Sequence, residues 1–139
     1  LLNEIGGAAL TYDRTVRSWG HFSAMALSSP QFDGNQLLVD VKKLIKNERQ
    51  FLVLKENGDV IHWSVGQSPS VVASNIRDIY QLAKRAILLK RNNGDLDILC
   101  GQYTLSTCSD SFNIDYNELK HFKTIIPGSY GFGAIIYEH

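Results

Sequence analysis

The 139-residue sequence has no long apolar run and no excess of charge of either sign. A membrane-spanning helix needs about 20 apolar residues, whereas the longest apolar runs, such as Ala86 to Leu89, have the length of a strand. Fourteen basic and fourteen acidic side chains cancel, so no overall field attracts phosphate backbones or an anionic membrane surface. We therefore expect no membrane span and no nucleic-acid partner.

Cysteine and histidine are too few and too dispersed to indicate a metal site. The only cysteines, Cys100 and Cys108, form neither a CxxC pair nor a multi-bridge framework, and they leave their own redox state and the compartment open. No two histidines have HxxxH or HExxH spacing. The four histidines are His21, His62, His121 and His139. The sequence predicts no metal and no cofactor.

Signatures of catalysis are also missing from the sequence. There is no GxSxG motif, and Cys108 has no neighbouring group in the sequence that would activate its thiol. The segment Gly128 to Gly133 ends in GxG but lacks the lysine and the strand-to-helix context of a phosphate loop. Its glycines are interpreted as allowing a strand to bend. Because no nucleophile, base and orienting group fall together, we predict that the chain is not an enzyme.

What the sequence does contain is an internal repeat. Its clearest copy runs from Val41 to Ser64: an apolar pair, a polar stretch, a four-residue apolar run, a turn, and a strand that ends in Trp63. The apolar pattern recurs 44 residues earlier, and again 35 and 81 residues later. A period of about 40 to 50 residues is typical of propeller blades. We predict one segment with repeats at about 1–40, 41–75, 76–121 and a partial copy at 122–139.

Each repeat is predicted to contain an antiparallel hairpin. Asn-Gly turns between apolar runs place Gly58 and Gly94 at positions that need positive φ. The predicted hairpins are Gly7 to Trp19, Phe51 to Trp63 and Ala86 to Cys100, followed by a final strand through Phe132 to Tyr137. Asp59 and Asp95 follow the turn glycines, where a turn role is favoured over a ring of carboxylates.

Two observations bear on the strands themselves. The runs Leu52 to Leu54 and Ile87 to Leu89 are apolar on both faces, as expected of strands sandwiched between neighbouring sheets. The segment Ser70 to Lys90 also satisfies helical spacing, so a helix there remains an alternative, although the repeat register favours sheet.

The runs Phe51 to Trp63 and Ala8 to Gly20 resemble the signature of chromosome-condensation-regulator repeats, in which an apolar run is followed by Asp-Gly, a short strand and Trp-Gly. The copies are degenerate. Ser64 follows Trp63 where the family usually has Gly, Leu99-Cys100 replaces Trp-Gly, and Asp13-Arg14 stands where the turn glycine belongs. The resemblance implies an all-β fold: about three blades plus a partial fourth of a β-propeller of four-stranded antiparallel sheets.

The resemblance also frames the function. Complete members form seven-bladed rings that bind through loops, and short-period versions are common in bacterial secreted, surface and effector-like proteins. We predict a non-catalytic protein-binding module of a bacterial effector, toxin or surface protein. The alternative is a regulator of an enzyme, either a nucleotide-exchange factor for a small GTPase or an inhibitor, because the family includes both. No functional residue of the exchange factor can be carried over to this sequence.

Candidate site residues fall in two groups. Trp19 and Trp63 occupy equivalent repeat positions and are interpreted as core between blades rather than as a ligand cage. The loops 21–35, 66–75 and 101–117 differ between copies, and loops on a rigid scaffold commonly carry binding residues. Tyr103, Phe112 and Tyr116 give the last loop aromatic reach, so they are the predicted binding residues.

The repeat count leads to an expectation about assembly. The sequence opens on Leu1 without a Met or a leader and ends within the fourth copy, so it resembles a piece of something longer. Closed propellers use about 4 to 8 blades. We expect the end surfaces to be covered by further copies joined head to tail, or by missing blades of the parent chain. The apolar residues expected on those surfaces are Leu10, Val16, Phe132, Ile135 and Ile136.

Overall fold

The computed structural model describes residues 1–3, 6–19, 38–64, 69–101, 104–108, 122–127 and 133–137. Within these ranges the chain forms thirteen β-strands and no α-helix. Accordingly, no helix in the described part has the length and apolar character required to cross a membrane. The predicted all-β class is confirmed.

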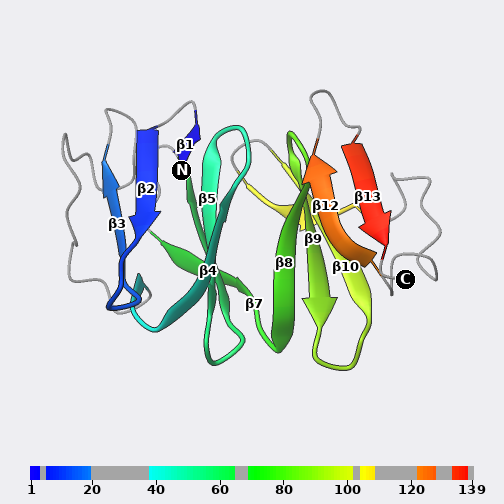
Figure 1. Ribbon diagram of the computed structural model, residues 1–139, viewed down its shortest axis with the longest axis horizontal. Helices are drawn as coiled ribbons and strands as arrows, with labels where there is room; N and C mark the ends of the chain where they lie inside the picture. The colour runs from blue at the N-terminus through cyan, green and yellow to red at the C-terminus, as the bar shows by residue number, and fades with distance from the viewer. Residues whose placement is uncertain are drawn as a thin grey trace.

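The strands form four antiparallel sheets, and each sheet is built from consecutive strands. The first contains β1 (Leu2–Asn3), β2 (Gly6–Leu10) and β3 (Val16–Trp19). The second contains β4 (Val41–Lys46), β5 (Gln50–Lys55), β6 (Val60–Ser64) and β7 (Ser70–Ala73). The third contains β8 (Ile76–Ala83), β9 (Ala86–Arg91), β10 (Leu96–Cys100) and β11 (Ser106–Thr107). The fourth contains β12 (Phe122–Pro127) and β13 (Gly133–Tyr137). The sheets stand side by side in sequence order (Figure 1).

The predicted hairpins are present as β2–β3, β5–β6 and β9–β10, and their turns lie along one edge of the molecule, at the bottom of Figure 1. The glycines of the second and third turns have φ of 93° at Gly58 and 91° at Gly94. The side-chain oxygens of Asn57 and Asn93 accept hydrogen bonds from the amides two residues on, at 3.0 and 2.9 Å. The Asn-x-Asp pattern therefore closes each turn locally.

The segment Ser70 to Lys90 forms strands, so the helical alternative is wrong. Its helical spacing has a physical origin in β8, where irregularities between Ile76 and Asp78 and between Gln81 and Ala83 interrupt the strand alternation. As a result Ile76 and Ile79, three residues apart, pack into the same cluster between the second and third sheets. A bulged strand can therefore imitate the periodicity of a helix.

The core lies between the sheets, in three clusters that each join two neighbours. Strand β5 shows why its apolar run is continuous: Phe51 and Val53 pack toward the first sheet, whereas Leu52 and Leu54 pack toward the third. All four side chains are almost fully buried. The interpretation of this run as a strand sandwiched between two sheets is confirmed.

The expectation that Leu10 and Val16 face an open end of the stack is wrong. These residues are directly opposite each other on β2 and β3, so their side chains point to the same face of the sheet. That face is the one against the second sheet, because Val16 is fully buried in a cluster with Phe51 and Trp63. At the other end, Ile135 and Ile136 lie on β13, and Phe132 falls outside the described residues.

Candidate functional site

Most of the loops that were predicted to bind partners fall outside the described residues. Tyr103, Phe112 and Tyr116 are among these, so their role as binding residues stays a prediction. The repeat positions are placed. Trp63 lies on β6, fully buried, with its ring centroid 5.6 Å from that of Phe51. Trp19 ends β3 opposite Gly7. The other two repeat positions, Gly58 and Gly94, lie in the hairpin turns.

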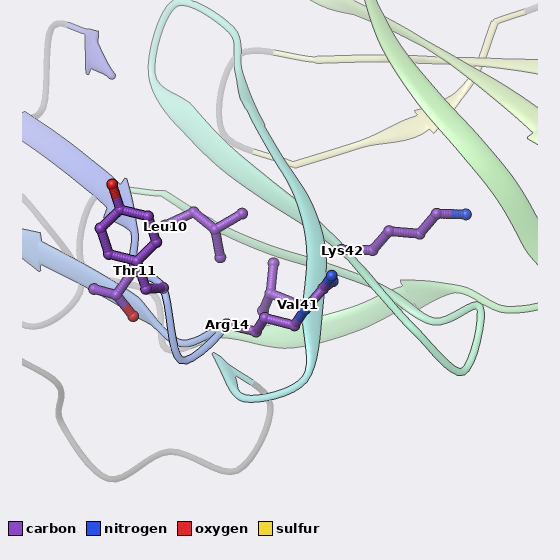
Figure 2. Close-up of a pocket in the computed structure, with 6 residues that line it drawn as sticks. Leu10, Thr11, Arg14, Val41 and Lys42 are labelled. Atoms are coloured by element: carbon purple, nitrogen blue, oxygen red, sulfur yellow. The ribbon is translucent and has the colours of Figure 1, made fainter.

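Sequence reasoning missed a hollow of about 550 Å³ where the β2–β3 turn meets the start of β4. The backbone fixes this junction, because the amide of Val41 donates to the carbonyl of Arg14 at 2.9 Å. Figure 2 shows Leu10 and Thr11 on the side of the first sheet and Val41 on β4, with Arg14 extending toward β4. The described residues that line the hollow are Leu10, Thr11, Tyr12, Arg14, Val41 and Lys42.

The hollow is lined by exposed large side chains and by two cationic residues. Tyr12 is completely exposed and Leu10 is 39% exposed, which is unusual for large apolar side chains in the described part of the chain. Arg14 forms an ion pair with Glu56, at 2.9 Å between Nη1 and Oε1, in which both side chains are about half exposed. Lys42 extends away from Leu10 (Figure 2), and its Nζ lies 3.5 Å from the carbonyl of Arg77.

The turn that carries Tyr12 and Arg14 is held by its own polar side chains. The hydroxyls of Thr11 and Thr15 donate to the carboxylate of Asp13, the second at 2.8 Å. These hydrogen bonds, from Thr11 first and then Thr15, lower the pKa of Asp13 below its ordinary value. The carboxylate is therefore ionised at neutral pH and hydrogen-bonded within the turn, whereas Arg14 pairs with Glu56.

A second hollow, of about 290 Å³, lies between β4 and β8. At its wall the Nζ of Lys43 is 3.0 Å from Asp78 Oδ1, donates to the Ile79 carbonyl at 2.7 Å, and sits 4.0 Å from the centre of the Tyr80 ring. Burial pushes the pKa of Asp78 up, but hydrogen bonds from Tyr80 and Lys43 outweigh it and leave the pKa below its ordinary value. Lys43 is thus occupied in joining two sheets.

His62 and Ser70 form a histidine–hydroxyl pair in the second sheet. His62 on β6 is buried, which lowers its pKa, so it is neutral at neutral pH. Its Nδ1 lies 3.5 Å from the Ser70 hydroxyl, whereas no described group hydrogen-bonds its Nε2. The pair therefore lacks a described third group that orients the imidazole. No three metal-binding side chains gather within the described ranges.

A disulfide joins Cys100 and Cys108, with their Cα atoms 5.8 Å apart. The sequence left this redox state open, because eight residues of separation are compatible with several local conformations. The strand pairing decides it: β11 folds back on β10 with Leu99 opposite Thr107, and the amide of Cys108 donates to the Ile98 carbonyl at 2.9 Å.

No protein-family model matches the chain, and no curated protein sequence matches it. Several solved structures do. The chain is similar to human WBSCR16, with 13% identity and a TM-score of 0.55 over 72% of this chain and 36% of that one. It is similar to a chain in the structure of Kap60 bound to yeast RCC1 (Prp20), with 14% identity and a TM-score of 0.59 over 91% and 38%. It is also similar to the N-terminal domain of Nup159, with 9% identity and a TM-score of 0.53 over 91% of this chain and 34% of that one.

These neighbours are β-propellers. At such low identity the likeness shows the fold alone, and it shows that the four sheets are blades of a partial β-propeller. The chain spans little more than a third of each of these structures.

Proposed function

We propose that the chain is a non-catalytic, protein-binding segment of a β-propeller. The observation that carries the proposal is the hollow at the β2–β3 turn, where Leu10 and Tyr12 are exposed beside Arg14 on a turn braced by internal hydrogen bonds. Tyrosine and arginine are enriched in protein interfaces. A rigid scaffold that presents them is suited to binding another protein rather than to chemistry.

The proposed setting is a bacterial effector, toxin or surface protein, secreted or exposed on the cell. The Cys100–Cys108 disulfide supports that setting, because disulfides persist in oxidising extracellular compartments. The chain is similar to propellers over little more than a third of their length. We accordingly propose that further blades complete the ring, either on the parent chain or from other copies of this one.

A photo-crosslinking experiment tests the binding function. A photoreactive phenylalanine analogue replaces Tyr12 in one variant and the exposed Val71 on β7 in a control. We expect a crosslinked partner at position 12 but not at 71, and we expect that partner, once purified, to bind the unmodified protein saturably. Equal labelling at both positions, or no saturable binding, would contradict the proposal. Capture of a nucleotide-free GTPase that added GTP reverses would instead assign nucleotide exchange.

Light scattering on the 139-residue chain tests the completion of the ring. We expect the isolated chain to associate, because exposed strand edges and apolar faces invite pairing. A monomer is expected only when the chain is joined to further blades. A soluble monomer at high concentration contradicts both versions.

A further inference from the structure

The β2–β3 turn differs from the two other hairpin turns at the position where they carry glycine. In all three turns the amide of the fourth residue donates to the carbonyl of the first at 3.0 Å. The fourth residue is Gly58 in the second turn and Gly94 in the third, with positive φ in both. In the first turn it is Arg14, with φ of 62°. Arginine disfavours this left-handed conformation, because its Cβ approaches the following carbonyl.

The fold does not account for an arginine at this position. The carbonyl of Arg14 accepts from Val41 at 2.9 Å, and the carbonyl of Gly58 accepts from Ile76 at 3.0 Å, so glycine performs the same backbone role one sheet later. The ion pair between Arg14 and Glu56 is about half exposed on both sides. Exposed pairs of this kind contribute little to stability. Local strain without a structural reason is expected at functional sites.

The surroundings of Arg14 indicate what it binds. Arg14 lines the hollow together with Leu10 and Tyr12, two exposed large side chains on the same hairpin. No acidic residue is among the described residues that line the hollow. Glu56 contacts Arg14 through a solvent-accessible pair that another carboxylate can share or replace. The positive charge of Arg14 and the apolar surface of Leu10 and Tyr12 therefore fit a segment that carries both a carboxylate and a large apolar side chain.

We propose that the hollow at the β2–β3 turn docks a partner-protein segment that carries a carboxylate next to a large apolar side chain. Arg14 binds the carboxylate, and Leu10 and Tyr12 receive the apolar side chain. The inference rests on the proposed protein-binding function and names the partner chemistry. The left-handed turn position, which is glycine in the other two hairpins, here presents the side chain of Arg14 to the partner.

The test separates binding from stability. The probe is a fluorescein-labelled pool of ten-residue peptides that alternate Glu with Leu or Phe, and the matched pool has Gln in place of Glu. Fluorescence anisotropy should show saturable binding of the Glu pool to the unmodified protein, weakened about tenfold by the Gln substitution and by added salt. Arg14→Gly should weaken binding about tenfold while its melting temperature stays equal or rises, and Arg14→Lys should retain most of the binding.

Lys46→Gln is the matched control, because Lys46 lies on β4 but lines the other hollow. It should bind the Glu pool like the unmodified protein. Absence of binding by the Glu pool, equal binding of both pools, or weaker binding in Lys46→Gln than in Arg14→Gly would overturn the inference. A melting temperature that falls in Arg14→Gly would also overturn it, because the arginine would then serve the fold. If the crosslinked partner binds Arg14→Gly as tightly as it binds the unmodified protein, this inference is wrong, but the proposed protein-binding function still holds.

Discussion

At the scale of single residues, the turn glycines are the positions where one methyl group has the clearest effect. Gly58→Ala and Gly94→Ala should each lower the free energy of unfolding by about 1–2 kcal/mol, because both residues have left-handed φ. A Cβ at Gly58 would also lie 3.4 Å from the Ile76 carbonyl oxygen, whereas one at Gly94 would meet nothing within 4 Å. The Gly58 variant should therefore be at least as destabilised.

Urea denaturation measures both variants against Asn92→Ala, an exposed change in the third turn that is expected to lie within about 0.5 kcal/mol of the unmodified protein. Glycine variants as stable as this control would show that the turns do not need positive φ.

Glu48 forms a second ionic link between the second and third sheets, beside the pair of Lys43 and Asp78. Its side chain is only 6% exposed, and its Oε2 accepts from the Nε of Arg85 at 2.6 Å. The guanidinium of Arg85 lowers the pKa of Glu48, helped by Lys84. Glu48→Gln should lower the free energy of unfolding at pH 7 by about 1.5–3 kcal/mol, the range for hydrogen bonds to charged groups.

The pH dependence follows from the direction of that shift. A carboxylate with a lowered pKa in the folded state stabilises the fold above its unfolded pKa, about 4.3 for Glu, and this contribution is lost as the pH falls further. The difference between Glu48→Gln and the unmodified protein should shrink between pH 5 and pH 3, as followed by thermal melts. The control Glu56→Gln removes a half-exposed pair and should change stability by about 0–1 kcal/mol. If Glu48→Gln and Glu56→Gln lower the stability equally, burial of the Glu48 pair does not strengthen it.

At the scale of elements, the parts of the fold that local chemistry decides were predictable. The Asn-Gly turns and the doubly apolar runs predicted β5–β6 and β9–β10 because turn geometry and burial on two faces depend on adjacent residues. The bulges of β8 were not predictable, since an extra residue is tolerated only once the partner strand is in place. The facing of Leu10 and Val16 was missed for a similar reason: which face of β2–β3 meets a neighbour depends on how the sheets stack.

The candidate site was only partly accessible from the sequence. The sequence marked Asp13-Arg14 as a departure from the repeat, but it did not predict that Arg14 would retain the left-handed turn. It also directed attention to aromatic residues of the long loops, such as Tyr103, rather than to Tyr12. The hollow beside Leu10 depends on how the first two sheets pack, which no local pattern encodes.

The Cys100–Cys108 disulfide holds the short strand β11 against β10. Strand β11 has two residues, so few backbone hydrogen bonds hold it to β10. The double variant Cys100→Ser, Cys108→Ser should lower the free energy of unfolding by about 2–3 kcal/mol, the loop-closure estimate for a ring of this length. In this variant, amide exchange should accelerate at position 108, whose N–H donates to the Ile98 carbonyl, but not in β5 of the second sheet. If exchange at position 108 is unchanged in the double variant, strand pairing alone holds β11.

At the scale of the whole molecule, the alternating clusters imply that each interface between sheets can be weakened separately. Two neighbours on β9 offer a matched pair: Leu88 packs with Ile98, Phe122 and Ile125 toward the fourth sheet, and Leu89 packs toward the second. Both side chains are almost fully buried. Leu88→Ala and Leu89→Ala should therefore cost similar amounts, about 2–5 kcal/mol each.

The two variants should differ in where the molecule opens. In repeat architectures, stability is approximately a sum of unit terms and nearest-neighbour interface terms. Leu88→Ala should accelerate amide exchange in β12 while β4 stays protected, and Leu89→Ala should accelerate exchange at the junction of β5 and β8, separating the first two sheets from the last two. Hydrogen exchange followed by NMR distinguishes these patterns residue by residue. If both variants accelerate the same set of amides to the same extent, the four sheets unfold as one cooperative unit, and the independence of the interfaces is wrong.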